Sequence, residues 1–162
     1  MTRKTIRPII LLAEDSDDDA FFFRWALQKN DLKCELVRAY DGMEAVDYLK
    51  KGVDASGRRN AECPDLVFLD LKMPACNGFE VLEWIRANPF DPPLDVAVLS
   101  GSEHAVDFER ATKLGATAYY VKPMSAAHLR ARFNAWQQQQ AQSQSAQPSS
   151  QSTAQGVRSG PA

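Results

Sequence analysis

The stretch Pro64-Asp65-Leu66-Val67-Phe68-Leu69-Asp70-Leu71-Lys72-Met73-Pro74 decides the fold of this chain. Its apolar residues 66–69 lead directly into the carboxylate of Asp70. A short apolar run bounded by prolines is typical of a strand buried on both faces, as in parallel sheets. Asp70 is therefore predicted at the carboxyl end of a strand, where open α/β sheets bind their ligands. A carboxylate there can bind a hard cation or act as a base or nucleophile; the alternative is a cap for the next loop or helix.

Composition narrows the class of protein. Of the 162 residues, 25% are charged and the formal net charge is −2, so nothing indicates a surface for nucleic acid. The three cysteines include no C-x-x-C pair, which argues against disulfides and zinc and fits a cytoplasmic protein. The apolar run at residues 8–13 is too short for a signal peptide or a membrane span, so no membrane partner is expected.

The composition changes after Trp136. Residues 137–162 are mostly Gln, Ser and Ala and carry a single charge, Arg158. Such a segment cannot bury enough apolar surface to offset the entropy that is lost on ordering, so we expect it to be disordered. Residues 1–136 are therefore predicted to form one domain, and residues 137–162 a disordered tail.

Strand and helix patterns alternate strictly through residues 1–136. Because crossovers between parallel strands are right-handed, five strands and five helices would form an α/β fold, an open parallel sheet with helices on both faces. The pattern does not fix the strand order; the flavodoxin-like, doubly wound (βα)5 order 2-1-3-4-5 is the common solution at this size. The predicted strands are 9–13, 34–39, 66–70, 96–100 and 118–122, and the predicted helices are 17–29, 42–50, 78–88, 103–114 and 125–138.

Local features of two segments add detail. Ser16 can cap the first helix, and Asp19 three residues later completes a capping-box pattern. The polar loop 51–63 is longer than most connections in such folds. Three aromatic residues give the first helix more aromatic surface than one core stripe needs; we favour packing beneath the 51–63 loop over a surface for a partner protein. These residues are Phe21, Phe22 and Trp25.

Reactive side chains follow four of the five predicted strands. Glu14 and Asp15 follow the first strand, Asp70 ends the third, and Ser100 and Lys122 end the fourth and fifth. Because the carboxyl ends of parallel strands meet at one edge of the sheet, these side chains should converge there. Clustered carboxylates repel one another unless they share a cation, and oxygen ligands suit Mg²⁺. The ammonium and the hydroxyl suit a phosphoryl group, so the set predicts phosphoryl transfer onto a carboxylate.

Six short motifs occur in a familiar order and spacing. They are LAEDS at 12–16, PDLVFLDLKMP at 64–74, NGFEVL at 77–82, VLSG at 98–101, GA at 115–116 and YYVKP at 119–123. With these motifs the chain resembles the receiver domain of bacterial two-component response regulators over roughly residues 8–136.

The resemblance implies a role for each matching residue of the acidic site. Asp70 would be the phosphoacceptor. Asp15 and Asp70 would hold Mg²⁺ directly, Glu14 would hold it through water, and the backbone carbonyl of Lys72 would also reach the metal. Two positions depart from the family's pattern: Lys72 places a cation beside the acceptor, and Cys76 stands where a larger apolar residue is usual.

The resemblance also implies how the phosphoryl group is bound and sensed. Ser100 and Lys122 would bind it, with Ser100 moving on activation. Tyr119 matches the family's switch aromatic, and the peptide bond before Pro123 is expected to be cis. The face from about 103 to 136 would then bind a partner in a phosphorylation-dependent way.

The partners follow from the same resemblance. A sensor histidine kinase would supply the phosphoryl group, and a downstream target, a phosphotransfer protein or a second copy of the chain would receive the signal. No output domain is seen after the receiver, and the 51–63 loop is long. In both respects the chain is similar to stand-alone, chemotaxis-regulator-like proteins, and to those paired with phytochrome-type histidine kinases.

Two other functions fit parts of the sequence. A Mg²⁺-dependent phosphohydrolase of the haloacid-dehalogenase type would use an Asp nucleophile, but it needs a second carboxylate where this chain has Lys72. A degenerate receiver that serves only as a docking module would not need the complete set of acids together with Ser100 and Lys122. The sequence favours a phosphoacceptor signalling protein that catalyses only its own phosphorylation and dephosphorylation.

Overall fold

The computed structural model describes residues 7–145, and within them five parallel strands alternate with five helices. The strand order is β2-β1-β3-β4-β5, so the predicted flavodoxin-like topology is confirmed. The strands are β1 (Ile9–Ala13), β2 (Glu35–Ala39), β3 (Leu66–Leu69), β4 (Val96–Ser100) and β5 (Ala118–Val121). The helices are α1 (Asp17–Lys29), α2 (Gly42–Lys51), α3 (Gly78–Ala87), α4 (Ala105–Lys113) and α5 (Ala126–Ser145).

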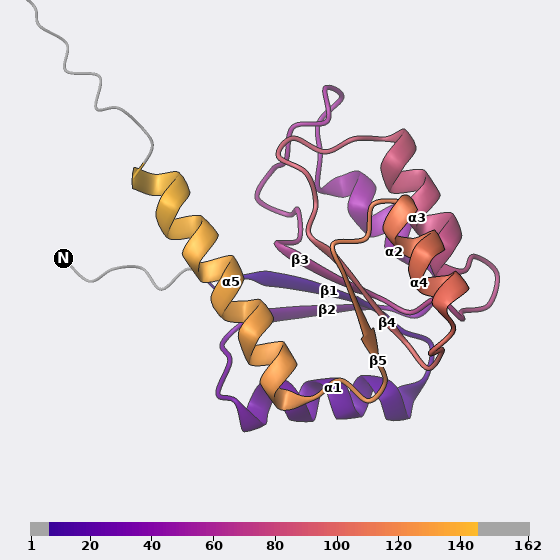
Figure 1. Cartoon of the computed structure of the whole chain (residues 1–162). Coiled ribbons are helices and arrows are strands. Elements are labelled where there is room, and N and C mark those ends of the chain that lie inside the picture. The colour runs from indigo at the N-terminus through magenta and orange to yellow at the C-terminus, as the bar shows by residue number, and fades with distance from the viewer. Residues whose placement is uncertain (1–6, 146–162) are drawn as a thin grey trace, which may run out of the picture.

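The sheet is covered on both faces, which explains why its central strands are apolar throughout. Successive side chains of a strand point to opposite faces. On β3, Val67 joins a core with α2, α3 and α4, while Phe68 joins a second core with α1 and α5. Figure 1 shows the two groups of helices on either side of the sheet.

The register brings the ends of β1 and β3 level with each other. Ala13 pairs with Leu69, and the backbone N–H of Asp70 donates to the carbonyl of Ala13 at 3.0 Å. The backbone N–H of Glu14 donates to the carbonyl of Ala39 on β2 at 2.9 Å. Backbone pairing therefore brings the residues that follow the two strands side by side at the carboxyl edge.

The last helix is longer than predicted. We expected it to end near Gln138 and residues 137–162 to be disordered, but α5 continues to Ser145. Gln and Ala have good helix propensity, so the helix continues past Trp136, its last buried residue, although the described side chains of the extension are exposed. The remainder of the predicted tail, residues 146–162, lies outside the described residues.

The 51–63 loop and the aromatic residues of α1 are separate features. The loop is fastened by isolated bridges between Val53 and Arg59 and between Arg58 and Asp91. It follows α2, whereas α1 covers the opposite face of the sheet (Figure 1). Packing of the aromatic residues beneath the loop is therefore wrong: Phe21, Phe22 and Trp25 are 64%, 53% and 50% exposed. Among residues 7–145, no helix is long and apolar enough to cross a membrane.

Candidate functional site

Three carboxylates converge at the carboxyl edge of the sheet. Glu14, Asp15 and Asp70 each bring one oxygen within 4.8 Å of the other two. Glu14 and Asp70 are buried and Asp15 is exposed, so the cluster is reached from solvent on one side. A set of carboxylate oxygens with access to water is the donor chemistry that suits Mg²⁺, and the three residues fit that ion.

Glu14 is a buried acid whose charged form is disfavoured by its surroundings. Its Oε1 accepts from the backbone N–H of Ser16 at 3.0 Å, and its Oε2 lies 2.5 Å from Lys122 Nζ without hydrogen-bond geometry. Burial raises the pKa of Glu14 to about 7; Lys122 and the Ser16 N–H oppose the shift, and the nearby Asp70 adds to it. A divalent cation at this cluster would relieve that cost by compensating the buried charge.

Lys122 is the cation present in the site. Its Nζ contacts Glu14 at 2.5 Å, Asp19 Oδ2 at 2.9 Å and Asp70 Oδ2 at 3.2 Å. Burial alone would lower the pKa of Lys122, but the close contacts with these carboxylates and their charges outweigh it and raise the pKa. The peptide bond between Lys122 and Pro123 is cis, the geometry that the resemblance implies.

Asp19 is a site residue that sequence reasoning missed. The predicted capping box forms only in part: the Asp19 N–H donates to Ser16 Oγ at 3.3 Å, but the Ser16 N–H goes to Glu14 rather than back to Asp19. The Asp19 carboxylate instead accepts from Lys122. The available signal was an acid in the first turn of the helix that begins at the reactive edge, which is ordinarily a favourable helix start.

Asp70 is oriented by the loop that follows it. Its Oδ1 accepts from the backbone N–H of Lys72 at 3.2 Å, while its Oδ2 faces Lys122. The side chain of Lys72 is exposed. The backbone carbonyl of Lys72 as a metal ligand stays a prediction.

Two glycines press against the loop that carries Asp70. Gly42, at the start of α2, donates its N–H to the carbonyl of Cys76 at 3.1 Å, and Gly78, at the start of α3, donates to the carbonyl of Leu71 at 3.1 Å. A Cβ at either glycine would overlap with backbone of that loop, with the Cys76 carbonyl at Gly42 and with the Asp70 carbonyl at Gly78. The glycines let two helices pack directly on the acceptor loop.

Arg38 fastens the loop that carries the other two acids, and sequence reasoning missed it as well. Its guanidinium donates to the carbonyls of Glu14 at 3.0 Å and Asp15 at 3.2 Å, and to the carboxylate of Asp17 at 2.8 Å. The same group stacks on the ring of Tyr40, 4.1 Å from its centroid. The only signal in the sequence was a basic residue near the end of a predicted edge strand.

Ser100 and Tyr119 share a neighbour, Ser102. Ser100, at the end of β4, is buried, and its Oγ accepts from the N–H of Ser102 at 3.1 Å. The hydroxyl of Tyr119 donates to the carbonyl of the same Ser102 at 2.9 Å. The Tyr119 ring packs edge-on against Phe108 of α4, with the centroids 5.8 Å apart. One short segment therefore contacts both residues that the resemblance assigns to switching.

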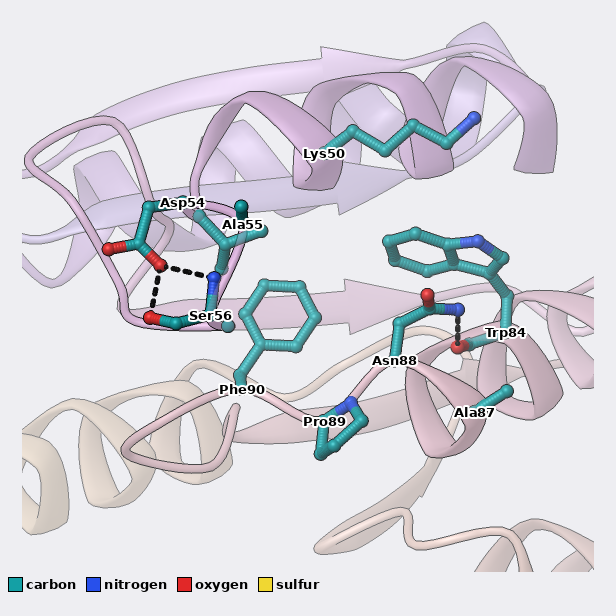
Figure 2. Close-up of a pocket in the computed structure, with 11 residues that line it drawn as sticks. Lys50, Asp54, Ala55, Ser56, Trp84, Ala87, Asn88, Pro89 and Phe90 are labelled. Carbon is teal, nitrogen blue, oxygen red and sulfur yellow. Dashed lines mark hydrogen bonds between the residues drawn. The ribbon is translucent and has the colours of Figure 1, made fainter.

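A hollow at the opposite edge of the sheet lacks such a set of groups. It has a volume of about 530 Å³ and lies between the 51–63 loop and the end of α3. Figure 2 shows the rings of Trp84 and Phe90 on its wall, and the carboxylate of Asp54 bonded to Ser56 beside it. Asp54 is satisfied by its own loop, and Lys50, the other charged lining residue, pairs with Asp47 at 3.5 Å. The hollow therefore offers no convergent charges for chemistry.

Comparison with known proteins places the site within one family. Residues 10–134, which include all the site residues above, match the model of the response regulator receiver domain. The response regulator Rcp1 of Synechocystis sp. is 32% identical over 114 residues, which are 70% of this chain and 76% of that protein. A Mn²⁺-bound form of response regulator Rcp1 superposes with a TM-score of 0.60 at 27% identity and covers 83% of this chain and 92% of its own.

Two further solved structures have the same fold. The bacteriophytochrome response regulator AtBRR is 34% identical, with a TM-score of 0.63 over 82% of this chain and 91% of its own. The phosphorylated cyanobacterial phytochrome response regulator RcpA is 30% identical, with a TM-score of 0.64 over 88% of this chain and 98% of its own.

Proposed function

This chain belongs to the response regulator receiver domain family, and from that premise we propose that Asp70 is its phosphoacceptor. As a response regulator, it is a signalling protein of two-component systems. The observation that supports the proposal best is the convergence of Asp70 with two other carboxylates and with Lys122, whose Nζ is 3.2 Å from Asp70 Oδ2.

The proposed reaction is a displacement at phosphorus. An oxygen of the Asp70 carboxylate forms the new O–P bond while the donor's N–P or O–P bond breaks, and the electron pair leaves with the phosphohistidine imidazole or the acyl carboxylate. Lys122 would balance negative charge on the phosphoryl oxygens, and the hydroxyl of Ser100 would donate to one of them. Mg²⁺, held by Glu14, Asp15, Asp70 and the carbonyl of Lys72, would supply further positive charge.

We propose a sensor histidine kinase as the donor, and a phytochrome-type kinase in particular. The relatives AtBRR and RcpA are described as phytochrome response regulators, and RcpA has been solved in a phosphorylated form. The Mn²⁺-bound form of Rcp1 supports a divalent cation at the acidic cluster. The two alternative functions find less support. A haloacid-dehalogenase-type phosphohydrolase needs a carboxylate two positions after Asp70, where this chain has a lysine. A degenerate docking module does not need the acids, Ser100 and Lys122 together at one edge.

The proposed output is a change on the face formed by α4, β5 and α5. A phosphoryl group at Asp70 adds about two negative charges and three acceptor oxygens, toward which Ser100 can close. Ser100 and Tyr119 both contact Ser102, so movement of Ser100 would alter the position that Tyr119 occupies. On α4, Val106 and Phe108 are 73% and 52% exposed, and Phe108 packs against Tyr119. A downstream protein or a second copy would bind there.

The chemical proposal is tested by intact mass. Wild-type protein incubated with acetyl phosphate and Mg²⁺ should gain the mass of one phosphoryl group, and chelation of the metal should prevent the gain. Asp70→Asn removes the nucleophilic oxygen while it preserves the size of the side chain, so it should show no gain. A gain that persists in Asp70→Asn would place the acceptor elsewhere.

The output proposal is tested by amide hydrogen exchange with and without a phosphoryl mimic. Protection should change from about residue 103 to 136, and Ser100→Ala should accept phosphate more slowly and fail to show that change. The coupling should be modest, roughly 1–3 kcal/mol, as for other two-state elements biased by a local charge. Changes confined to the 51–63 loop and α1 would show that the output face is misplaced.

A further inference from the structure

Asp19 stands apart from the other acids of the site. It lies on the first turn of α1 rather than at a strand end, and it is not among the three carboxylates that could share a cation. Its carboxylate nevertheless takes the hydrogen bond of Lys122, from Nζ to Oδ2 at 2.9 Å. Asp70, at 3.2 Å, is the farthest of the three carboxylates around that ammonium.

We propose that Asp19 is a positioning residue that competes with the phosphorylated acceptor for Lys122. The inference rests on the proposed function and adds a control on it. Before phosphorylation, Asp19 draws the ammonium toward α1. After phosphorylation, the ammonium must turn toward the phosphoryl oxygens, so the hydrogen bond to Asp19 is given up.

The exposure of the two partners decides how strongly Asp19 can compete. The side chain of Lys122 is 13% exposed and that of Asp19 is 38% exposed, so solvent weakens the ion pair from the Asp19 side. A phosphoryl group carries about two negative charges, more than the single charge of Asp19. The ammonium of Lys122 therefore binds the phosphoryl group in preference to Asp19, and Asp19 slows phosphorylation without blocking it.

The chain offers a matched control. Asp18 is the same residue type, one position earlier in the same helical turn, and is exposed. Asp19→Asn and Asp18→Asn remove the same charge from the same end of α1, but only the first removes an anionic partner of Lys122. A difference between them therefore reports the contact and not the overall field.

The kinetic test follows phosphorylation by acetyl phosphate with intact mass. Asp19→Asn should react about two- to fivefold faster than wild type, the change in rate that corresponds to loss of one partly exposed ion pair. Asp18→Asn should match wild type. A rate for Asp19→Asn that equals that of Asp18→Asn, or falls below wild type, would overturn the competition.

Two further measurements establish that Asp19 acts through Lys122. Beryllofluoride, a phosphoryl mimic, should bind Asp19→Asn more tightly by a similar factor, and this gain should vanish when Lys122→Met is added to both proteins. A gain that survives Lys122→Met would contradict the proposal.

The second measurement needs no phosphorylation. Nuclear magnetic resonance of the Lys122 ammonium should show slow proton exchange in wild type and in Asp18→Asn, and faster exchange in Asp19→Asn. Slow exchange that persists in Asp19→Asn overturns the inference alone. Failure of wild type to take up a phosphoryl group at Asp70 overturns the proposed function and the competition with it.

Discussion

Carboxylates at the two edges of the sheet differ in burial and in the direction of their pKa shifts. At the carboxyl edge Glu14 is 1% exposed, and burial raises its pKa to about 7. At the amino edge Asp54 is exposed, and hydrogen bonds from the Ser56 side chain, the Ser56 N–H and the Arg58 N–H lower its pKa. The surroundings of Glu14 disfavour its charged form, whereas those of Asp54 favour it.

The larger hollow lies at the amino edge, away from the crowded carboxylates. The hollow beside Asp54 has about 530 Å³, whereas the hollow beside Lys122 and Asp19 has about 10 Å³. A pocket large enough for a ligand therefore lies away from the reactive groups. A site that accepts one small group from a partner protein needs converging charges and an open rim, and charge crowding identifies it better than volume does.

Removal of one carboxylate at each edge, by Asp15→Ala or Asp54→Ala, should produce the largest difference in phosphorylation. Asp15→Ala removes a cation ligand, so Mg²⁺-dependent phosphorylation should fall at least about 100-fold. In metal-free buffer the melting temperature should stay the same or rise, because a repulsion is relieved. Asp54→Ala should do the opposite: it should keep phosphorylation and lower the melting temperature by the loss of local hydrogen bonds.

Intact mass and thermal unfolding measure these two quantities. A clear loss of melting temperature for Asp15→Ala without metal would contradict the picture of repelling acids.

The pH dependence of stability sharpens the contrast. The ordinary pKa of Glu14 is 4.5 and the folded value is about 7, so the folded state binds the proton more tightly than the unfolded state. The cost of the buried anion is present above the folded pKa and disappears as the pH falls toward the unfolded one. Without metal, the free energy of unfolding should therefore rise by about 2 kcal/mol from about pH 8 to about pH 5.

Chemical denaturation over that range, with Glu14→Gln as the control, measures the effect. The rise should be absent in Glu14→Gln. Asp54 cannot produce this rise. Its pKa is lowered in the folded state, so its carboxylate stabilises the fold and this contribution is lost only in more acidic solution. A rise that remains in Glu14→Gln would assign the titration to another group.

A smaller effect is expected from two arginines that anchor loops at opposite edges. Arg38 binds the carbonyls of Glu14 and Asp15, whereas Arg59 binds the carbonyl of Pro64 at 2.7 Å and the thiol of Cys63 at 3.1 Å. Arg38→Gln should weaken Mg²⁺ binding about tenfold, as loss of a group that orients metal ligands does. Arg59→Gln should leave Mg²⁺ binding unchanged and lower the melting temperature.

Titration calorimetry with Mg²⁺ measures the affinity. Arg38→Lys keeps the charge but cannot reach all the acceptors, so it should recover only part of it. Full recovery by lysine would mean that Arg38 acts through its charge alone.

The smallest effect belongs to the far end of α5. The described side chains beyond Trp136 are exposed, so a chain that ends at Gln140 should keep its melting temperature to within about 1 °C and its rate of phosphorylation. Differential scanning calorimetry and intact mass provide the check. A loss of either property would show that the end of the chain packs on the domain.

Local patterns in the sequence predicted much of the fold and the strand-end residues of the site. An apolar run that ends in Asp70, or in Glu14 and Asp15, specifies both a buried strand and the position of the acid. The contact between Asp19 and Lys122 could not be predicted in this way, since it joins residues 103 positions apart and depends on side-chain conformations. Arg38 escaped notice for the same reason.

Errors at the periphery have a different origin. The continuation of α5 to Ser145 depends on intrinsic helix propensity without burial, which composition had assigned to disorder. The aromatic residues Phe21, Phe22 and Trp25 were assigned to packing, because hydrophobic side chains usually are. They are exposed because they lie on the side of α1 away from its buried stripe, which is formed by Ala20, Phe23, Ala26 and Leu27.

The two glycines beneath the acceptor loop have a consequence for mutational tolerance. Any side chain at position 42 or 78 would collide with the backbone of residues 70–76 and displace the acceptor itself. In a library that randomises both positions and is sorted for phosphorylation, glycine alone should be recovered, although neither residue carries a functional group. The site thus restricts the choice of amino acid at positions that take no part in its chemistry, and sequence space around it is narrower than its reactive residues suggest.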